Sequence, residues 1–281
     1  MSLPRGAETP ETTAVEWELE QLKRKIERER GFQCQHYKGK CLRRRIAVRM
    51  RVRGVAGFAD YAALLDRDPL EYDVLLDALT INVSKFFRNA EVWDELERGV
   101  VPALFARPEP LVRVWSAGSA AGEEAYSLAI LLQEHAERSG RLAELRRFRI
   151  VGTDIDHRSL ELARRAEYPE LALGETSAAR RTRWFTPAPP HRLHDEARRR
   201  VGFRRHDLLA DPPEAGQSLI LCRNVIIYFE REVQERLFQR FHDALLPGGF
   251  LVLGKVETLL GGARALYHAL SHRDRIFQRP P

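Results

Sequence analysis

Two adjacent carboxylates follow a glycine-containing turn near the middle of the chain. The segment VWSAGSAAGEEAYSL (Val114–Leu128) is typical of a strand, a turn with Gly118 near its start, and a helix whose first turn holds Glu123 and Glu124. The pyrophosphate of a dinucleotide would dock at this helix start, where two carboxylates would repel it. They would instead attract a cofactor that carries positive charge. Acids also favour helix N-termini on electrostatic grounds alone, but the glycine turn before them favours a binding site.

A third carboxylate follows the next predicted strand. Asp154 lies in TDID at the end of Phe148–Thr153, where it can accept hydrogen bonds from both ribose hydroxyls of an adenosine. The alternative role, an aspartate that caps the following helix, fits Asp156 better. Asp207, in RHDLL, is a weaker candidate for contact with the adenine edge. An adenosine that also carries ammonium and sulfonium groups is S-adenosylmethionine, and the acids together indicate a site for it.

The elements around these acids alternate between strand and helix after Pro110. The expected strands are Leu111–Ser116, Phe148–Thr153, Ser218–Cys222 and Phe250–Leu253, and the expected helices are Glu123–Arg138, Arg158–Arg165 and Glu232–Leu245. This alternation predicts an α/β fold with a doubly wound, mostly parallel sheet. Residues from about 169 to 203 fit the alternation poorly, and we expect them to form an inserted subdomain.

Before the α/β region, the spacing of apolar residues predicts helices alone. They are expected at Glu16–Arg30, Lys40–Arg53, Phe58–Leu65 and Leu70–Thr80. We therefore divide the chain into a disordered tail (1–15), a helical N-terminal domain (16–85), a linker (86–110) and a cofactor-binding catalytic domain (111–281).

The chain is basic, and much of the charge lies in one predicted helix. The 281 residues carry a formal net charge of +6, and the segment Lys38–Arg53 holds eight Lys or Arg residues and no acid. Lys40, Arg43, Arg44 and Arg51 share one arc of that helix. A run of charge is usually a solvated helix face, but eight bases without an acid favour a surface that attracts an acidic partner.

Other features of the composition narrow the class of protein. No apolar run approaches the roughly 20 residues of a membrane helix, and the polar N-terminus does not resemble a signal peptide. We therefore expect a cytoplasmic protein without membrane insertion. Three cysteines argue against a disulfide framework. Cys34, His36 and Cys41 lack a fourth ligand, so no metal site is expected.

Several motifs, in order along the chain, resemble those of the chemotaxis receptor methyltransferase family, CheR. They are LTINVSKFFRN (Leu79–Asn89), VWSAGSAAGEEAYSLA, GTDID, ILCRNVIIYF (Ile220–Phe229) and LLPGGFLVLGKVETL (Leu245–Leu259). The resemblance implies a class I methyltransferase-type sheet, a small all-α N-terminal domain and a short β-subdomain insertion. It also implies that the protein esterifies glutamates on bacterial chemoreceptors, with S-adenosylmethionine as cofactor and S-adenosylhomocysteine as product.

The resemblance also implies roles for individual residues. Cofactor contacts are implied for Asn82, Ser84, Arg88, Glu124, Asp154, Asp207, Leu208, Arg223 and Asn224. Arg88 and Tyr228 would lie beside the transferred methyl group, as the candidate catalytic residues. A glutamate is already ionised at neutral pH and needs no general base, so the expected work is alignment and desolvation. The partner would be the acidic helical methylation region of a chemoreceptor, bound by Lys40, Arg43, Arg44 and Arg51.

The sequence departs from the family pattern at several places. Ser119-Ala120-Ala121 stands where Cys-Ser-Thr is usual, Ala125 where proline is usual, and Gly254-Lys255-Val256-Glu257 where Gly-His-Ser-Glu is usual. Family members carry a β-subdomain that in some binds a receptor pentapeptide. The matching segment here, Trp184–Val201, is short and lacks glycines, so we expect no such tether. We also expect a monomer.

Two other functions fit parts of the pattern. A class I methyltransferase could act on RNA or on a small acid, with the basic helix binding phosphates. No stacking aromatics alternate with the bases of that helix, so nucleic acid is not the expected partner. A non-catalytic regulator of a signalling array could keep the fold and bind the cofactor as a sensor. The changed loop residues leave this alternative open, although Arg88, Asp154, Arg223 and Tyr228 are all present.

Overall fold

The computed structural model describes residues 10–80 and 84–281, which form two compact units. The smaller unit contains residues 10–80 together with Tyr228–Glu230. The larger unit contains residues 84–227 and Arg231–Pro281. The division falls close to the expected end of the helical domain, but the sequence did not indicate that a short segment after residue 227 belongs with the helices.

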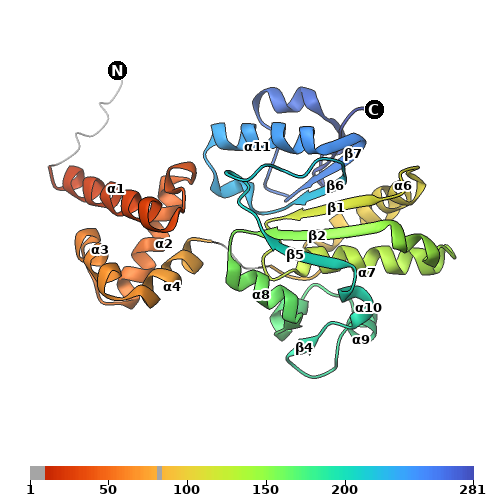
Figure 1. The fold of residues 1–281 in the computed structure, drawn as a ribbon, viewed down its shortest axis with the longest axis horizontal. Coiled ribbons are helices and arrows are strands. Elements are labelled where there is room, and N and C mark those ends of the chain that lie inside the picture. The colour runs from red at the N-terminus through yellow and green to blue at the C-terminus, as the bar shows by residue number, and fades with distance from the viewer. Residues whose placement is uncertain (1–9, 81–83) are drawn as a thin grey trace, which may run out of the picture. The chain divides into compact units, whose positions relative to one another are not determined.

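The smaller unit is helical, as the apolar spacing predicts (Figure 1). Its elements are α1 (Pro10–Arg30), η1 (Cys34–His36), α2 (Gly39–Val52), α3 (Phe58–Arg67) and α4 (Pro69–Leu79). Leu22 and Ile26 of α1 meet Ile46 of α2 and Leu75 of α4 in one buried core. The expected tail therefore ends earlier than residue 15, because α1 already begins at Pro10.

The larger unit is built on a seven-stranded sheet of order β5-β2-β1-β6-β7-β9-β8. The strands are β1 (Val112–Ala117), β2 (Phe148–Asp154), β5 (Val201–Arg205), β6 (Gln217–Cys222), β7 (Leu245–Leu253), β8 (His268–Ser271) and β9 (Ile276–Gln278). The first five strands in this order pair in parallel, and β9 pairs antiparallel with both β7 and β8. The expected doubly wound, mostly parallel sheet is confirmed.

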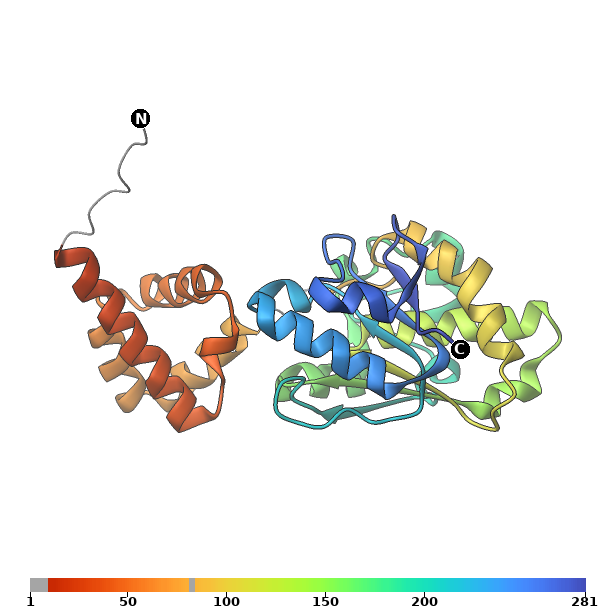
Figure 2. The ribbon, with the colours of Figure 1, turned by 90° about the horizontal axis from the view of Figure 1, so that it is seen from above.

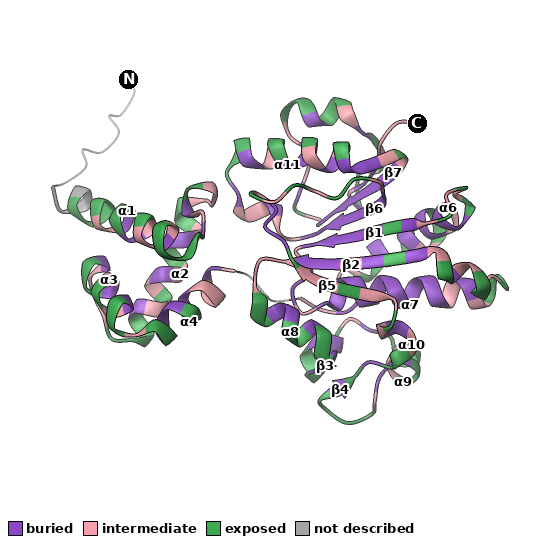
Figure 3. Ribbon diagram, viewed as in Figure 1, coloured by how far each residue is buried: buried purple, intermediate pink, exposed green. Residues whose placement is uncertain are grey.

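Helices cover both faces of this sheet. The helices α7 (Glu123–Arg138) and α8 (His157–Arg165) lie on one face, and α11 (Arg231–Ala244) lies on the other (Figures 1 and 2). Short 3-10 segments lie in several connections, among them η3 (Leu142–Arg147), η6 (Gly261–Leu266) and η5 (Ile226–Tyr228), whose last residue belongs to the smaller unit. The central strands β1 and β6 are almost wholly buried (Figure 3), as near-continuous apolar runs in a covered parallel sheet should be.

The register of the central strands aligns their carboxyl ends. Trp115 of β1 is paired with Val151 of β2 on one side and with Ile220 of β6 on the other. Loops that leave these three strands therefore start at the same edge of the sheet. In open α/β sheets this edge is where ligands bind.

The expected linker at residues 86–110 is instead largely helical and belongs to the larger unit. It forms α5 (Ala90–Glu95), the π-helix η2 (Leu96–Val100) and α6 (Val101–Ala106). Trp93, Leu104 and Phe105 are buried in the same core as α7. This segment carries enough apolar side chains to cover the end of that core. It therefore packs against the core and does not form an extended linker.

The irregular region after α8 contains an inserted two-stranded sheet. The strands β3 (Glu167–Tyr168) and β4 (His191–Arg192) pair antiparallel, with η4 (Glu170–Leu173), α9 (Ala178–Trp184) and α10 (Asp195–Arg198) around them. The expected insertion at about 169–203 thus ends slightly late, because Val201 already starts β5 at the edge of the main sheet.

Among the described residues, no helix has both the length and the apolar character needed to cross a membrane. The same residues contain no group of three or more His, Cys, Asp or Glu side chains placed to hold a metal ion.

Candidate cofactor and active site

The turn after β1 is bound to the end of β2. The backbone N–H groups of Gly118 and Ser119 both donate to the Thr153 carbonyl, each at 2.8 Å. Gly118 has φ +76°, and a Cβ at this position would lie 2.4 Å from Cγ2 of Val225. The turn therefore requires glycine here for its backbone conformation and for its close contact with the loop after β6.

Asp154, the last residue of β2, holds this turn with its carboxylate. Its Oδ2 accepts from the Ala120 N–H at 2.9 Å, and its Oδ1 accepts from the Asp156 N–H at 3.0 Å. Burial raises its pKa, although the side chain stays partly exposed. Asp156 is the N-cap of α8, with its carboxylate accepting from the N–H groups of Arg158 and Ser159. Asp156 thus has the capping role that the sequence predicts for it, whereas the Asp154 carboxylate joins the end of β2 to the turn after β1.

Glu124 points its carboxylate into the protein toward the ends of β1 and β6. Its Oε1 accepts from the Ser116 hydroxyl at 2.8 Å, and its Oε2 lies 3.8 Å from Nη1 of Arg223. Burial raises the pKa of Glu124, while the Arg223 guanidinium opposes that rise. Since Ser116 lies next to the last residue of the buried strand β1, this hydrogen bond fixes the position of the Glu124 carboxylate in the first turn of α7.

Glu123 is buried but lacks such partners. Its Oε2 has no hydrogen-bond partner among the described residues. Burial, reinforced by the nearby charges of Glu124 and Asp154, raises its pKa to about 7. The two acids of the motif therefore have different environments, and only Glu123 has a carboxylate oxygen that is buried without a hydrogen-bond partner among the described residues.

Arg223, the first residue after β6, joins three segments of the larger unit. Its Nη2 donates to the Arg88 carbonyl at 2.8 Å and approaches Asn89 Oδ1 at 3.3 Å. Its guanidinium lies 5.6 Å from the centre of the Trp93 ring. Together with the Glu124 contact, this buried cation fixes the segment around Arg88 against the start of α7.

The loop after Arg223 is organised by one buried carboxylate, Glu257. Its Oε1 accepts from the N–H groups of Val225, Ile226 and Ile227, at 3.0, 2.8 and 3.3 Å. Its Oε2 accepts from the N–H groups of Asn224 and Gly254, at 2.9 and 2.6 Å. Asn224 itself has φ +62° and an Oδ1 that is buried without a partner in the described structure.

The loop after β5 contributes Asp207 and Leu208. The His206 N–H donates to the Asp154 carbonyl at 3.0 Å, which brings this loop against the end of β2. Asp207 Oδ1 accepts from the N–H groups of Leu209 and Ala210, at 2.8 and 3.3 Å, so this oxygen shapes its own loop. Both Asp207 and Leu208 are buried.

Most residues that the sequence assigned to the cofactor therefore follow neighbouring strands at one edge of the sheet. They are Gly118 after β1, Asp154 at the end of β2, Asp207 and Leu208 after β5, and Arg223 and Asn224 after β6, with Glu124 at the start of α7. Ser84 and Arg88 are partly exposed in the segment before α5. Asn82 lies outside the described residues.

The remaining candidates belong to the smaller unit. Tyr228 has the Arg45 guanidinium 5.3 Å from its ring centre, and its carbonyl accepts from the Lys38 N–H at 2.8 Å. The side chains of Lys40, Arg43, Arg44 and Arg51 are all exposed on α2. Arg43 forms an ion pair with Glu16.

Three other arginines of the basic segment Lys38–Arg53 form contacts within the smaller unit. Arg49 donates to both oxygens of the buried Glu71, at 3.0 and 2.7 Å, and Arg53 also pairs with Glu71. Arg45 donates to the carbonyls of Ala78 and Leu79. These three arginines stabilise the helical unit, so only part of the charge run faces solvent.

Sequence reasoning missed the residues that support the site. Ser116, Asn89 and Trp93 contact Glu124 or Arg223, and none of them has a predicted role, although Ser116 and Asn89 lie inside the quoted motifs. Glu257 had a detectable signal, because it is the acid in the Gly-x-x-Glu segment after β7. The family's Gly-His-Ser-Glu segment keeps this acid here, and only the two residues before it, Lys255 and Val256, differ.

The arrangement fits S-adenosylmethionine. Asp154 offers carboxylate oxygens at the end of the second strand, where a ribose is bound in this fold class. Buried oxygens without partners in the described structure, on Glu123 and Asn224, lie on the two segments that meet at Gly118. The first turn of α7 holds two acids, which would repel a phosphate group. They suit a cofactor with positively charged ammonium and sulfonium groups. The fold and these side chains define a class I, S-adenosylmethionine-dependent methyltransferase.

Comparison with known proteins gives the family. Residues 82–275 match the model described as "CheR methyltransferase, SAM binding domain", and residues 17–80 match "CheR methyltransferase, all-alpha domain". The chain belongs to the CheR family, as its motifs indicated.

Two relatives show the extent of the similarity. A chemotaxis protein methyltransferase of Listeria innocua is 36% identical over 241 residues, which cover 85% of this chain and 89% of the relative. Chemotaxis protein methyltransferase 2 of Pseudomonas aeruginosa is 34% identical over 250 residues, which cover 86% of this chain and 87% of the relative. The similarity spans both units, so the protein is a chemotaxis-type methyltransferase that uses S-adenosylmethionine.

Proposed function

We propose that this protein forms methyl esters on glutamate side chains of chemoreceptors, in the cytoplasm. The observation that carries the proposal is the cluster of Asp154, Glu124 and Arg223 at one edge of a CheR-family sheet. Relatives that match most of the chain are named chemotaxis protein methyltransferases, which supports a chemoreceptor as the substrate.

The residues at the ends of the strands would each bind a different part of the cofactor. Asp154 accepts from the ribose hydroxyls, and Glu124 faces the ammonium group. Asp207 and Leu208 contact the adenine, with Asp207 Oδ1 holding its own loop through the N–H groups of Leu209 and Ala210. The turn at Gly118 brings the backbone close to the cofactor without a side chain in the way.

The methyl transfer requires no covalent intermediate with the protein. S-adenosylmethionine, when bound, supplies a methyl group on a positively charged sulfur. The acceptor glutamate is ionised at neutral pH, so no residue has to remove a proton. We assign Arg88 to steering the acceptor carboxylate by a charge-assisted hydrogen bond, and Tyr228 to orienting it beside the methyl. Their contribution is alignment and exclusion of water.

The exposed face of α2 would bind the receptor. Lys40, Arg44 and Arg51 lie on the solvent side of α2, and the opposite side of the helix is used in the unit's own core. A methylation region made of acidic helices would be attracted to these charges and oriented by them. No pentapeptide tether and no second copy of the chain are needed in this proposal.

The test is methyl transfer from labelled S-adenosylmethionine to a purified chemoreceptor cytoplasmic fragment. We expect label in the receptor that mild base releases as methanol, because esters hydrolyse there and N-methyl groups do not. Arg88→Ala should lower kcat by roughly 100-fold, as expected for loss of a charged orienting contact. The matched control is Arg98→Ala, an exposed arginine after α5 that should leave the rate unchanged.

Other outcomes would contradict the proposal. Base-stable label, or label in RNA but not in receptor, would assign a different methyl acceptor. Binding of S-adenosylhomocysteine without transfer to any receptor fragment would favour the non-catalytic regulator.

The receptor-binding face has its own test. Arg44→Glu/Arg51→Glu should raise KM for the receptor by about tenfold or more at low ionic strength, with an unchanged affinity for S-adenosylhomocysteine. Added salt should reduce the difference between variant and wild type. Arg24→Glu/Arg28→Glu, which reverses two exposed charges on α1 of the same unit, is the control. An equal effect of both variants would mean that only net charge matters.

A further inference from the structure

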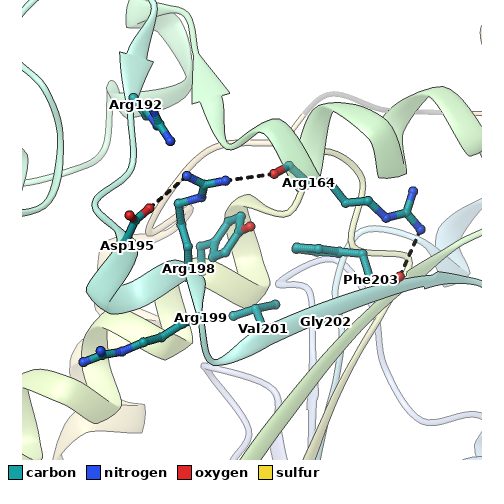
Figure 4. A pocket seen from close by; sticks show the side chains of 9 residues that line it. Arg164, Arg192, Asp195, Arg198, Arg199, Val201, Gly202 and Phe203 are labelled. Carbon is teal, nitrogen blue, oxygen red and sulfur yellow. Dashed lines mark hydrogen bonds and ion pairs between the residues drawn. The ribbon is translucent and has the colours of Figure 1, made fainter.

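A second pocket lies in the larger unit, at the free edge of the main sheet. It has a volume of about 680 Å³ and is lined from α8, β4, α10 and β5 (Figure 4). Four of its lining residues are Arg164, Arg192, Arg198 and Arg199, and a single acid, Asp195, accompanies them. None of these residues takes part in the cofactor site described above.

The arginines are only partly neutralised. Arg198 donates to Asp195 at 3.0 Å and to the Arg164 carbonyl at 3.2 Å (Figure 4), but Asp195 is 84% exposed, so water weakens that pair. The side chains of Arg192 and Arg199 form no hydrogen bond or ion pair with any residue that the structure describes. In Figure 4 the guanidinium groups of Arg192 and Arg198 lie near each other, whereas the side chains of Arg199 and Arg164 extend toward opposite sides of the pocket. Like charges that line one pocket repel each other, and an anion bound beside them would reduce that repulsion.

The wall opposite these charges is aromatic. Phe203 of β5 is partly exposed and packs edge-on against Tyr126, with ring centres 5.2 Å apart. The Phe203 ring also fills the space beside two glycines, 2.8 Å from where a Cβ of Gly122 would be and 2.5 Å from that of Gly152. The ring therefore stands between this pocket and the turn that follows β1.

We propose that this pocket binds a phosphate-bearing ligand of nucleotide size, separately from S-adenosylmethionine. Its volume lies within the range of small-molecule sites, which is about 300–1,000 Å³. Guanidinium groups match phosphate oxygens in charge and geometry, and the Phe203 ring offers an apolar face to a base.

The same geometry disfavours a peptide added as a strand to the free edge of β5. Arg164 Nη2 donates to the Phe203 carbonyl at 3.0 Å (Figure 4), so an edge acceptor that an added strand would need is already occupied. A compact anion needs none of these backbone groups.

The experiment is calorimetric titration of the full chain with GDP while S-adenosylhomocysteine saturates the cofactor site. GDP lacks adenine, which limits its competition for that site. We expect binding that inorganic phosphate competes away. Arg192→Gln/Arg199→Gln should weaken GDP binding at least about tenfold, and should leave the fold intact because neither side chain has a partner in the described structure. Arg236→Gln, an exposed arginine on α11, should change nothing.

Several results would overturn the inference. They are no GDP binding at millimolar concentration in the presence of S-adenosylhomocysteine, including the case in which GDP binds only when S-adenosylhomocysteine is left out, and GDP binding that Arg192→Gln/Arg199→Gln does not weaken. An acidic peptide that occupies the pocket and is not displaced by GDP would also overturn it.

Discussion

At the scale of single residues, the adjacent acids Glu123 and Glu124 show how position decides ionisation. Glu124 has a serine hydroxyl and an arginine within reach, whereas Glu123 has an oxygen without a partner among the described residues. Burial raises the pKa of both. The sequence places the two acids together, but only the packing around each one separates their roles.

Glu123→Gln should therefore change how stability depends on pH. The folded-state pKa of about 7 lies above the ordinary value of 4.5, so between these pH values the folded state holds more protons than the unfolded state. Stability contributed by the neutral form is lost as pH rises through that window, by an amount on the order of 3 kcal/mol. The glutamine variant cannot ionise, so it should be more stable than wild type at pH 8 and about equally stable near pH 4.5.

Urea unfolding of the ligand-free protein between pH 4.5 and 8 measures this difference. Glu167→Gln, which removes an exposed carboxylate on β3, is the control and should show no such trend. A constant difference between wild type and Glu123→Gln across the range would contradict the environment assigned to Glu123.

Glu257 is the second residue whose role follows from its contacts. It accepts hydrogen bonds from five backbone N–H groups, four of them in the loop at 224–227. Glu257→Gln replaces an acceptor oxygen with an NH2 group that faces those donors. We expect a loss of about 2–3 kcal/mol in unfolding free energy and weaker S-adenosylhomocysteine binding.

Chemical denaturation and calorimetry check the two effects of Glu257→Gln. Glu232→Gln, in the exposed first turn of α11, should leave both unchanged. Retained stability together with retained binding would mean that the loop does not depend on this carboxylate.

At the scale of elements, the turn between β1 and α7 depends on glycine at one point. Gly118→Ala would place a methyl group 2.4 Å from Val225, in a backbone conformation with φ +76°. Gly140→Ala is a matched control, because Gly140 has φ +69° and no atom within 4 Å of its added Cβ. We expect Gly118→Ala to cost about 1–3 kcal/mol more than the control in thermal unfolding, and to weaken cofactor binding. Equal costs for the two variants would show that backbone conformation alone matters.

The elements that the sequence predicted well are those with long periodic patterns. The helix expected at Glu123–Arg138 coincides with α7, and the strand expected at Phe148–Thr153 is one residue shorter than β2. The short strand β5 was missed because its Gly202 and Arg205 are exposed, so VGFRR has no apolar alternation. The linker prediction failed because the strand–helix alternation starts only after Pro110, whereas the buried side chains of Trp93 and Phe105 already pack the preceding segment into the larger unit.

At the scale of the whole molecule, the sheet topology brings together candidate residues that are far apart in the sequence. Candidate residues from Gly118 to Asn224 gather because β5, β2, β1 and β6 run parallel and end at one edge. Motif order and family resemblance predicted most of this set. The supporting contacts of Ser116, Asn89 and Trp93 could not be predicted, because they depend on which side chains the packing turns inward.

Calorimetry with S-adenosylhomocysteine tests most directly whether the cofactor binds at this edge of the sheet. Wild type should bind with micromolar affinity. Asp154→Ala should bind at least about tenfold more weakly, whereas Asp156→Ala, which removes only the cap of α8, should keep its affinity while losing some stability. Absence of binding to the wild type, or equal affinities for the wild type and Asp154→Ala, would contradict the account.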